Sequence, residues 1–447
     1  MKYFTSIIGG VLLLLVLAMG AWHIALSQPL TPISKDTSGF KGHILAASDA
    51  DMLATAYADG ILNKLEGIED SLSVIKVSNG KASIIGKSFA TNSVVSWPAI
   101  LAWHPGKRYA YVAETRGLYT GLENKVKNVY TDLPKGTLIS VVDLNNPTKP
   151  TLIQQKSVGK EIQGVSLNAK GDLLVAGSTE KGKELVLIKL EGGLLGEVSY
   201  FSHEGIKGSD NNNSGFRTIE FHPTEDVIAA NLNNTELAFF QVSREDSTLS
   251  IDQIGKILLV AKHWSVGNWH PNGKFFLLSD VAWGSGDAGF VLNGKGKLVS
   301  VGFNPEGNHQ IVSQQKVGMS PEGFDVSPNG KYAIVVNMRR TYLPKNIWFV
   351  PGRTKSSLSL LKIEENSGEL IPLGKEYGFK GTLPEDAVFD LESNSIAVAV
   401  YQEQDELYPK KGWVEFWEVE DDKLIKTAEK IEVTRGVHNL KLAKLLE

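Results

Sequence analysis

Short apolar stretches alternate with tight polar turns along most of the chain. The turn recurs in one form: Ser or His, then Pro, then Asn-Gly-Lys or a variant of it, followed by a run of strand-forming residues. Seven copies occur about 50 to 60 residues apart, at 48–51, 104–108, 168–172, 222–226, 270–274, 327–331 and 390–394. Repeats of this length are typical of β-propeller blades.

Within one repeat the hydrophobic pattern predicts four strands. The sixth repeat shows them most clearly, at 323–327, 332–337, 357–363 and 369–375. The third of these alternates apolar and polar residues with a period near two, as a half-buried strand does. We therefore predict an all-β fold over residues 42–447, a seven-bladed β-propeller of four-stranded antiparallel blades. One more strand at 435–442 is expected to pair with material near the N-terminus and close the ring.

The N-terminal segment has a different pattern. After Lys2, an almost uninterrupted apolar run extends from Ile7 to Leu26, which is long enough to span a bilayer. Small residues at 25 and 27 also suit cleavage by a signal peptidase. Residues 1–27 are thus predicted to be a signal peptide or, if uncleaved, a membrane anchor formed by 7–26, and 28–41 a linker. A buried segment of a soluble protein is the third alternative.

Both favoured alternatives export the propeller, so we expect a periplasmic or secreted protein that touches a membrane only through this segment. The net charge of −4 and the absence of a dense Lys/Arg cluster argue against a nucleic-acid partner. Because the chain has no cysteine, disulfides, thiolate metal sites and cysteine nucleophiles are excluded. The signatures of serine hydrolases, phosphate loops and zinc proteases are absent as well.

Loop length predicts a working face. Turns between the first and second strands are uniformly short, whereas the loops expected on the other face of the disc include 115–135, 202–214, 281–295, 338–356 and 402–412. Loops this long are uncommon unless they are functional or disordered. We expect them to surround one mouth of the central channel. Arg339, Arg340 and Tyr342 are candidate ligand contacts there, because Arg and Tyr are enriched in binding surfaces.

Polar residues also recur where each innermost strand is expected to begin, five residues before the turn. In a propeller this position faces the axis near the channel mouth. The candidates at or beside it are His43, Trp97, Gln163, Arg217, His263, Trp264, Glu322, Glu385, Asp386 and, on the terminal strand, His438.

These axial residues leave three interpretations open. Glu322 or Asp386 could be a general base and a histidine such as His438 a general acid, while Arg217 holds a carboxylate or an oxyanion. Clustered carboxylates with Gln163 could instead bind calcium through oxygen ligands, although no cofactor is predicted. Alternatively, they line a wet channel without reacting.

Two other polar patterns are predicted to be structural. The histidines that precede proline in the turns, His104, His222 and His270, are expected to pack against the aromatic residue before each of them. The stretch 48–51 has calcium-like spacing of its two aspartates but lacks the following glycine and glutamate, and we expect a simple turn.

The units 326–337 (Val-Ser-Pro-Asn-Gly-Lys-Tyr-Ala-Ile-Val-Val-Asn) and 269–274 (Trp-His-Pro-Asn-Gly-Lys) resemble the repeats of seven-bladed lactonase-type propellers and of related YVTN-like surface-layer propellers. The resemblance covers most of 42–446. It implies the propeller fold and an activity that hydrolyses or isomerises sugar or muconate lactones with axial His, Arg and Glu residues, for which Arg217 and Glu322 occupy matching kinds of position.

The sequence thus favours an exported propeller that binds a small-molecule ligand or a protein partner at its long-loop face. A lactonase-like hydrolase is the alternative, and a structural cell-surface repeat protein is the third interpretation.

Overall fold

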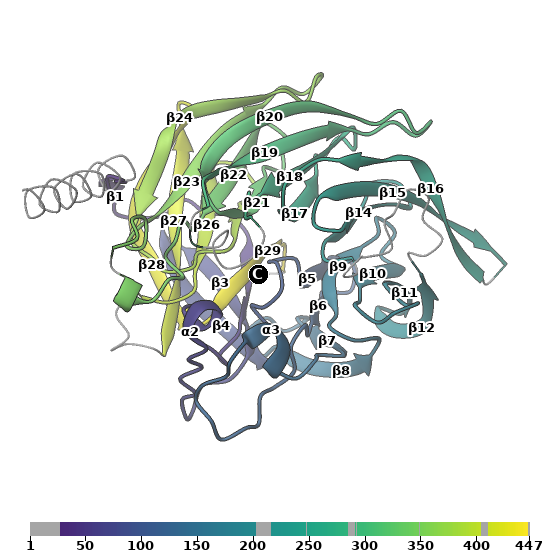
Figure 1. The fold of residues 1–447 in the computed structure, drawn as a ribbon, viewed down its shortest axis with the longest axis horizontal. Coiled ribbons are helices and arrows are strands. Elements are labelled where there is room, and N and C mark those ends of the chain that lie inside the picture. The colour runs from purple at the N-terminus through teal and green to yellow at the C-terminus, as the bar shows by residue number, and fades with distance from the viewer. Residues whose placement is uncertain are drawn as a thin grey trace, which may run out of the picture.

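Seven four-stranded sheets surround a central axis (Figure 1). The structure is a computed structural model that describes residues 27–202, 216–246, 248–284, 291, 293–347, 349–403 and 410–445. Each sheet is an antiparallel meander, apart from one added strand described below. The prediction of a seven-bladed β-propeller is confirmed.

Blades two to seven follow the chain, each from its inner to its outer strand. Blade two comprises β5 (Leu101–His104), β6 (Tyr109–Ala113), β7 (Leu138–Asp143) and β8 (Thr151–Ser157). Blade three comprises β9 (Gln163–Leu167), β10 (Leu173–Gly177), β11 (Leu185–Glu191) and β12 (Leu194–Phe201). Blade four comprises β13 (Ile219–Phe221), β14 (Val227–Leu232), β15 (Glu236–Glu245) and β16 (Thr248–Leu259). Blade five comprises β17 (Trp264–Trp269), β18 (Phe275–Asp280), β19 (Lys295–Gly302) and β20 (Gln310–Met319). Blade six comprises β21 (Pro321–Val326), β22 (Tyr332–Asn337), β23 (Ser356–Ile363) and β24 (Leu370–Phe379). Blade seven comprises β25 (Ala387–Phe389), β26 (Ser395–Val400), β27 (Lys411–Glu420) and β28 (Lys423–Thr434).

Blade one is assembled from both ends of the chain. Its strand order is β29 (Val437–Ala443), β2 (His43–Ser48), β3 (Ser71–Ser78) and β4 (Lys81–Phe89), so that the yellow last strand lies beside purple strands in Figure 1. This pairing closes the ring as predicted and removes two free sheet edges. It places the terminal strand innermost, and β2 is therefore the second strand of its blade.

This register corrects one sequence prediction. The stretch 48–51 does not join a first strand to a second one; it begins the long connection from β2 to β3 on the long-loop face. The repeat pattern places this turn after the first strand of blade one, whereas it follows the second strand, because the first strand of this blade lies at the other end of the chain.

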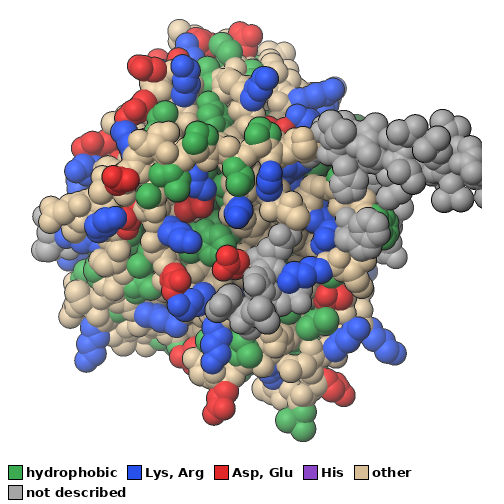
Figure 2. Space-filling view, turned by 90° about the vertical axis from the view of Figure 1, so that its left-hand side faces the viewer, with side chains coloured by type: hydrophobic (Ala, Val, Ile, Leu, Met, Phe, Trp, Pro, Cys, Tyr) green, Lys and Arg blue, Asp and Glu red, His purple; other side chains and the backbone are tan. Residues whose placement is uncertain are grey.

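Part of the predicted linker is also structured. β1 (Ile33–Lys35) adds a fifth strand to blade seven, parallel to β28. Ahead of it, the Gln28 side-chain amide donates to the Glu376 carbonyl at 2.9 Å. The predicted signal peptide or anchor lies outside the described residues, among which no helix is long and apolar enough to cross a membrane. On the side of the propeller that bears β1 and β28, Lys, Arg, Asp and Glu side chains are interspersed (Figure 2).

The recurring turn joins neighbouring blades. His270 Nε2 lies 2.9 Å from the Gly330 carbonyl oxygen of the next blade's turn, and His222 Nε2 lies 2.9 Å from that of Gly273. Gly330 has a positive φ of 74°, and a Cβ there would lie 2.7 Å from the His270 ring. His222 and His270 therefore have a structural role, as predicted, but the ring contacts differ from the prediction. His222 meets Trp269 of the following blade and His270 meets Phe275, which follows it in the chain, instead of the aromatic residue just before each histidine.

The hydrophobic core is divided between adjacent blades. Between blades four and five, for example, Phe239, Trp264, Trp269 and Phe276 pack together and are buried. Their rings meet edge-on or tilted, with centroids 5.3 to 6.2 Å apart. Because strands of both blades contribute, each blade is stabilised mainly by its neighbours.

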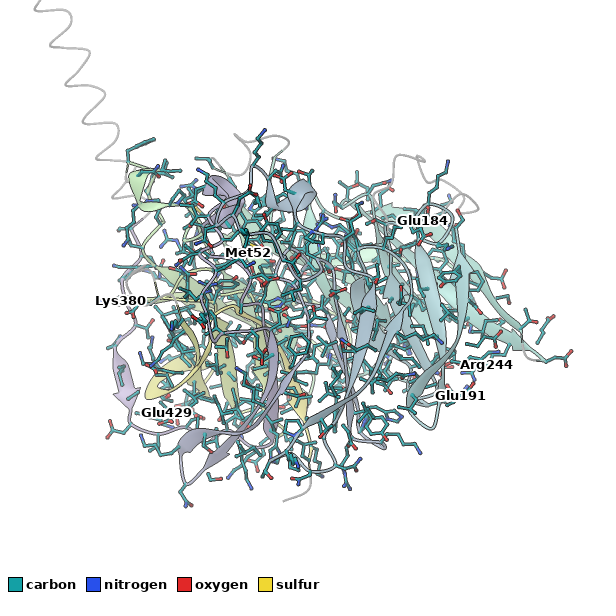
Figure 3. The ribbon with its side chains drawn as sticks, turned by 90° about the horizontal axis from the view of Figure 1, so that it is seen from below. Met52, Glu184, Glu191, Arg244, Lys380 and Glu429 are labelled. Carbon is teal, nitrogen blue, oxygen red and sulfur yellow. The ribbon has the colours of Figure 1, made fainter. Side chains whose placement is uncertain are left out.

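A further apolar cluster covers one face of the disc. It includes Met52, helix α2 (Ala56–Asp59), helix α3 (Val129–Asp132), Leu343 and Tyr401, and we call it the loop cap. The 3₁₀ helix η2 (Lys345–Ile347) packs beside it. In the edge-on view, Met52 and Glu184 lie toward this face, whereas Glu191 and Arg244 lie toward the other (Figure 3). The long loops 115–135 and 338–356 thus meet on one face, as their lengths predicted.

Candidate functional site

A cavity of ≈ 270 Å³ lies at the channel mouth beneath the loop cap. This volume is slightly below the range of roughly 300–1,000 Å³ common for small-molecule sites. Its lining combines aromatic, aliphatic and ionisable side chains: Tyr57, Val94, Val95, Ser96, Trp97, Tyr130, Arg217, His263, Trp283, Gly284, Glu322, Met338, Tyr342, Leu383 and Glu385.

The starts of the innermost strands supply most of the polar lining. Trp97 precedes β5, Arg217 precedes β13, His263 precedes β17, Glu322 lies in β21 and Glu385 precedes β25. Five blades therefore each contribute one predicted residue to a single cavity. This convergence follows from the propeller's rotational repeat, which brings equivalent positions of every blade to the axis.

Arg217 is held in place by a neighbouring blade. Its Nε donates to Gln163 Oε1 at 3.0 Å, and one terminal nitrogen lies 3.5 Å from Asn234 Oδ1. The guanidinium lies 5.1 Å from the centre of the Trp97 ring, within cation–π range. Burial lowers the pKa of Arg217, but a guanidinium stays protonated in proteins. The cavity therefore contains one oriented, permanent positive charge.

The two glutamates of the cavity are buried carboxyls. Burial raises the pKa of Glu322 to about 8; the nearby Arg217 opposes this and Asp386 adds to it. Burial raises the pKa of Glu385 well above its usual value, and Glu322 adds to the effect. At neutral pH both side chains are therefore mostly protonated and can donate a hydrogen bond. Calcium would bind these carboxyls only in their ionised form.

His438 lies behind Glu385 rather than in the cavity. Its Nε2 is 2.8 Å from Asn92 Oδ1, and the Asn92 amide nitrogen already donates to the carbonyls of Ser48 and Ala90. Nε2 must therefore carry the proton, which leaves the Nδ1 lone pair facing Glu385 Oε2 at 3.8 Å. Burial lowers the pKa of His438 to about 3. At 3.8 Å the two atoms are too far apart for a hydrogen bond, and neither has a hydrogen-bond partner among the described residues.

His263 is a neutral imidazole at the cavity wall. Burial and the charge of Arg217 lower its pKa to about 4. Its ring meets those of Trp97 and Trp283 edge-on, with centroids 5.6 and 5.9 Å apart. Among the described residues, neither His263 Nε2 nor Trp97 Nε1 has a hydrogen-bond partner, although both atoms are buried.

The remaining predicted residues lie elsewhere. Asp386 accepts hydrogen bonds from Asn439 Nδ2 and the Leu440 N–H, both at 2.7 Å, and so joins blade seven to the closing strand. Trp264 is fully buried in the core between blades four and five. His43 begins the second strand of blade one, opposite Ala443, at the far end of the disc from the cavity.

The predicted loop arginines build the cap instead of lining the cavity. Arg339 and Arg340 are both buried. Arg340 donates to the Asn293 side chain and carbonyl at 3.2 and 2.7 Å and to the Pro351 carbonyl at 3.0 Å. These contacts tie two loops together. Tyr342, from the same loop, does line the cavity.

Sequence reasoning missed the loop residues that complete the cavity. Tyr57 and Tyr130 come from α2 and α3, with ring centroids 5.8 Å apart, and the Tyr57 hydroxyl donates to the Val94 carbonyl at 2.5 Å. Trp283 lies 5.9 Å from Tyr342, ring to ring. Only their position in long loops of the working face could have pointed to them, because no repeat marks them.

Acidic side chains anchor the cap at blade one. Carboxylate oxygens of Asp49, Asp51 and Asp70 lie within 4.8 Å of one another. Four backbone N–H groups already donate to Asp49 and Asp70, at 2.8 to 3.1 Å. Burial and the neighbouring Asp51 raise the pKa of Asp49 to about 7, and the cationic Arg435, which donates to the Asn63 carbonyl at 3.1 Å, offsets only part of this rise. The stretch 48–51 is therefore part of a buried, hydrogen-bonded acidic anchor and not a simple turn.

The blade count and the closure define a seven-bladed β-propeller, a fold that the chain shares with solved lactonase-type propellers. The chain is similar to a putative 6-phosphogluconolactonase from Bacteroides uniformis, with a TM-score of 0.61, 13% identity and coverage of 90% of this chain and 99% of that one. It is equally similar to the periplasmic gluconolactonase of Pseudomonas aeruginosa, with a TM-score of 0.60, 13% identity and coverage of 91% and 99%. At this identity the likeness establishes the fold alone. No family model and no curated protein sequence matches the chain.

Proposed function

We propose that this propeller is exported and binds a small organic ligand in the cavity beneath the loop cap. The observation that carries the proposal is the oriented Arg217, held by Gln163 against Trp97 in a cavity that also contains Glu322. Because the lining lies below the cap, a small molecule is a better occupant than a protein partner. The apolar run of residues 7–26 supports export.

Unpartnered polar atoms support ligand binding. A buried donor or acceptor without a partner costs about 1–3 kcal/mol. Trp97 Nε1 and His263 Nε2 are in this state among the described residues, and both side chains line the cavity. A ligand that hydrogen-bonds with them would recover this free energy.

Lactone hydrolysis is the second candidate function, favoured by the neutral His263 beside Arg217. In this scheme His263 Nε2 takes a proton from a water molecule as the water oxygen attacks the lactone carbonyl carbon. Arg217 stabilises the resulting oxyanion. The carbonyl re-forms as the ring C–O bond breaks, and protonated Glu322 gives its proton to the leaving alkoxide. The product is the open hydroxy acid, and the proton on His263 returns to Glu322 through solvent. The two similar structures named as lactonases support this candidate.

A ligand screen tests the binding proposal. Purified protein is screened by thermal shift against small organic acids, amides, amines and lactones, and hits are measured by calorimetry. Arg217→Met should weaken any hit at least tenfold, whereas Arg244→Met, on the exposed opposite face, should not change it. Hits that bind both variants equally would reject the cavity as the site.

Lactone opening is followed separately by pH-stat on simple lactones. We expect Glu322→Gln to abolish turnover with unchanged thermal stability at pH 5. Full turnover in that variant would reject Glu322 as the proton donor and leave the binding proposal standing.

A further inference from the structure

We infer that the ligand is a small organic monoanion, a carboxylate on a flat, apolar body, with the carboxylate on Arg217 and the body between the aromatic rings of the cavity. The inference rests on the proposed binding function and narrows it to one class of molecule. Three features of the cavity carry it: its charge, its excess of donors and the shape of its walls.

The cavity has a net positive charge at neutral pH. Arg217 is always charged. Burial raises the pKa of Glu322 and Glu385, and burial together with Arg217 lowers that of His263, so these three groups are mostly neutral. Arg116, another cation near the cap, is already paired with Glu161. A ligand with one negative charge would therefore leave the cavity electrically balanced.

The polar groups that lack partners favour an acceptor-rich ligand. Arg217 uses its Nε and one terminal nitrogen on Gln163 and Asn234, and the guanidinium fork has five N–H groups in all. Trp97 Nε1 can only donate, and it has no partner among the described residues. A carboxylate presents two oxygens that accept hydrogen bonds and suits a guanidinium fork. Trp97 Nε1, which lies beside Arg217, would donate one more hydrogen bond to such a carboxylate.

The walls suit a flat body. Trp283 lies 6.0 Å from Trp97 and 5.9 Å from Tyr342, ring to ring, and Met338 and Leu383 complete an apolar surface. A polyhydroxylated sugar would leave hydroxyl groups without partners against these walls. The volume of ≈ 270 Å³ also limits the ligand to a small molecule.

The same geometry disfavours a cationic ligand. Aromatic cages bind quaternary ammonium groups through ring faces. Here the guanidinium of Arg217 already lies 5.1 Å from the Trp97 ring centre. A ligand cation would meet a fixed positive charge at that ring.

Three matched probes test the inference by calorimetry at pH 7: phenylacetate, its neutral amide phenylacetamide, and 2-phenylethylammonium. They share one ring and differ in charge. We expect phenylacetate to bind at least tenfold more tightly than the amide and the ammonium compound to bind most weakly. Gluconate, a hydroxylated carboxylate, should bind more weakly than phenylacetate.

Variants assign the effect to named groups. Arg217→Met should reduce phenylacetate affinity at least tenfold and leave the amide within about twofold. If that variant does not fold, Arg217→Lys keeps the charge but loses the fork, and an intermediate loss is expected. Trp97→Phe keeps an aromatic ring, although a smaller one, and removes the donor, so the anion should lose affinity severalfold. Arg244→Met is the control and should match the wild type.

The outcomes separate this inference from the proposed function. If the amide or the ammonium compound binds as tightly as phenylacetate or more tightly, the inference is overturned, but the proposal that the cavity binds a small ligand is upheld. The inference would also be overturned, and binding upheld, if a neutral or cationic compound from the wider screen binds, loses affinity in Arg217→Met, and phenylacetate does not bind. If no member of either set binds, the proposed function fails as well.

Discussion

Replacing Glu322 with Gln tests whether this buried carboxyl is neutral in the folded chain. The side chain is 4% exposed at the start of the inner strand of blade six. Burial raises its pKa to about 8 from an unperturbed 4.5, so the folded chain binds more protons than the unfolded one between these pH values. The stability contributed by this group is therefore full below pH 4.5 and is lost as pH rises toward 8.

The magnitude follows from the two pKa values. One pKa unit corresponds to about 1.4 kcal/mol, so ionisation of Glu322 lowers the free energy of unfolding by about 1 kcal/mol at pH 5 and about 4 kcal/mol at pH 8. Gln has nearly the same shape and cannot ionise. The stability of Glu322→Gln relative to the wild type should thus increase by about 3 kcal/mol between pH 5 and pH 8.

The assay is guanidinium unfolding of both proteins, followed by tryptophan fluorescence at several pH values. The other buried carboxyls, such as Asp386, are present in both proteins and largely cancel in the comparison. A difference that changes by less than about 1 kcal/mol across this range would refute the reasoning. It would mean that Glu322 is ionised in the folded chain, which would also remove the proton donor from the lactone scheme.

Three further predictions concern the architecture. Arg435→Met removes a fully buried cation from the acidic anchor of the cap and should cost about 3 kcal/mol or more in unfolding free energy, whereas Arg244→Met, which breaks a surface pair, should cost under about 1 kcal/mol. Gly436→Ala should destabilise the folded chain strongly, because the φ of Gly436 is 88° and a Cβ there would lie 1.6 Å from a backbone carbonyl oxygen. Its control is Gly182→Ala, where φ is 80° but the surrounding space is open, and calorimetry should show a cost of only about 1–2 kcal/mol. Deleting residues 437–445 leaves β2 unpaired on its inner side, so circular dichroism and gel filtration should show loss of cooperative unfolding or aggregation; a stable monomer would contradict the closure.

The sequence was informative wherever the propeller repeats. The turns gave the number of blades, and counting back from them located Arg217, His263, Glu322 and Glu385 near one mouth. Rotational symmetry makes this possible, because one position per blade is enough to define an axial ring. Adjacent residues remained ambiguous: Asp386, next to Glu385, points instead to the closing strand.

Other parts of the site lay beyond this reasoning for physical reasons. Tyr57 and Tyr130 belong to loops whose conformation depends on contacts with other loops, and no local pattern encodes those contacts. The arginines at 339 and 340 suit a binding surface by composition, yet the loop folds back and buries them. His43 was misplaced because the chain completes blade one from its far end.

That shared blade also has a consequence for the order of folding. His43 pairs with Ala443, about 400 positions later in the chain. The ring therefore cannot close until residue 443 has been synthesised, and pairing across such a separation is intrinsically slow. Until then blade one lacks its innermost strand, so the nascent chain keeps an open ring with an unpaired sheet edge at β2.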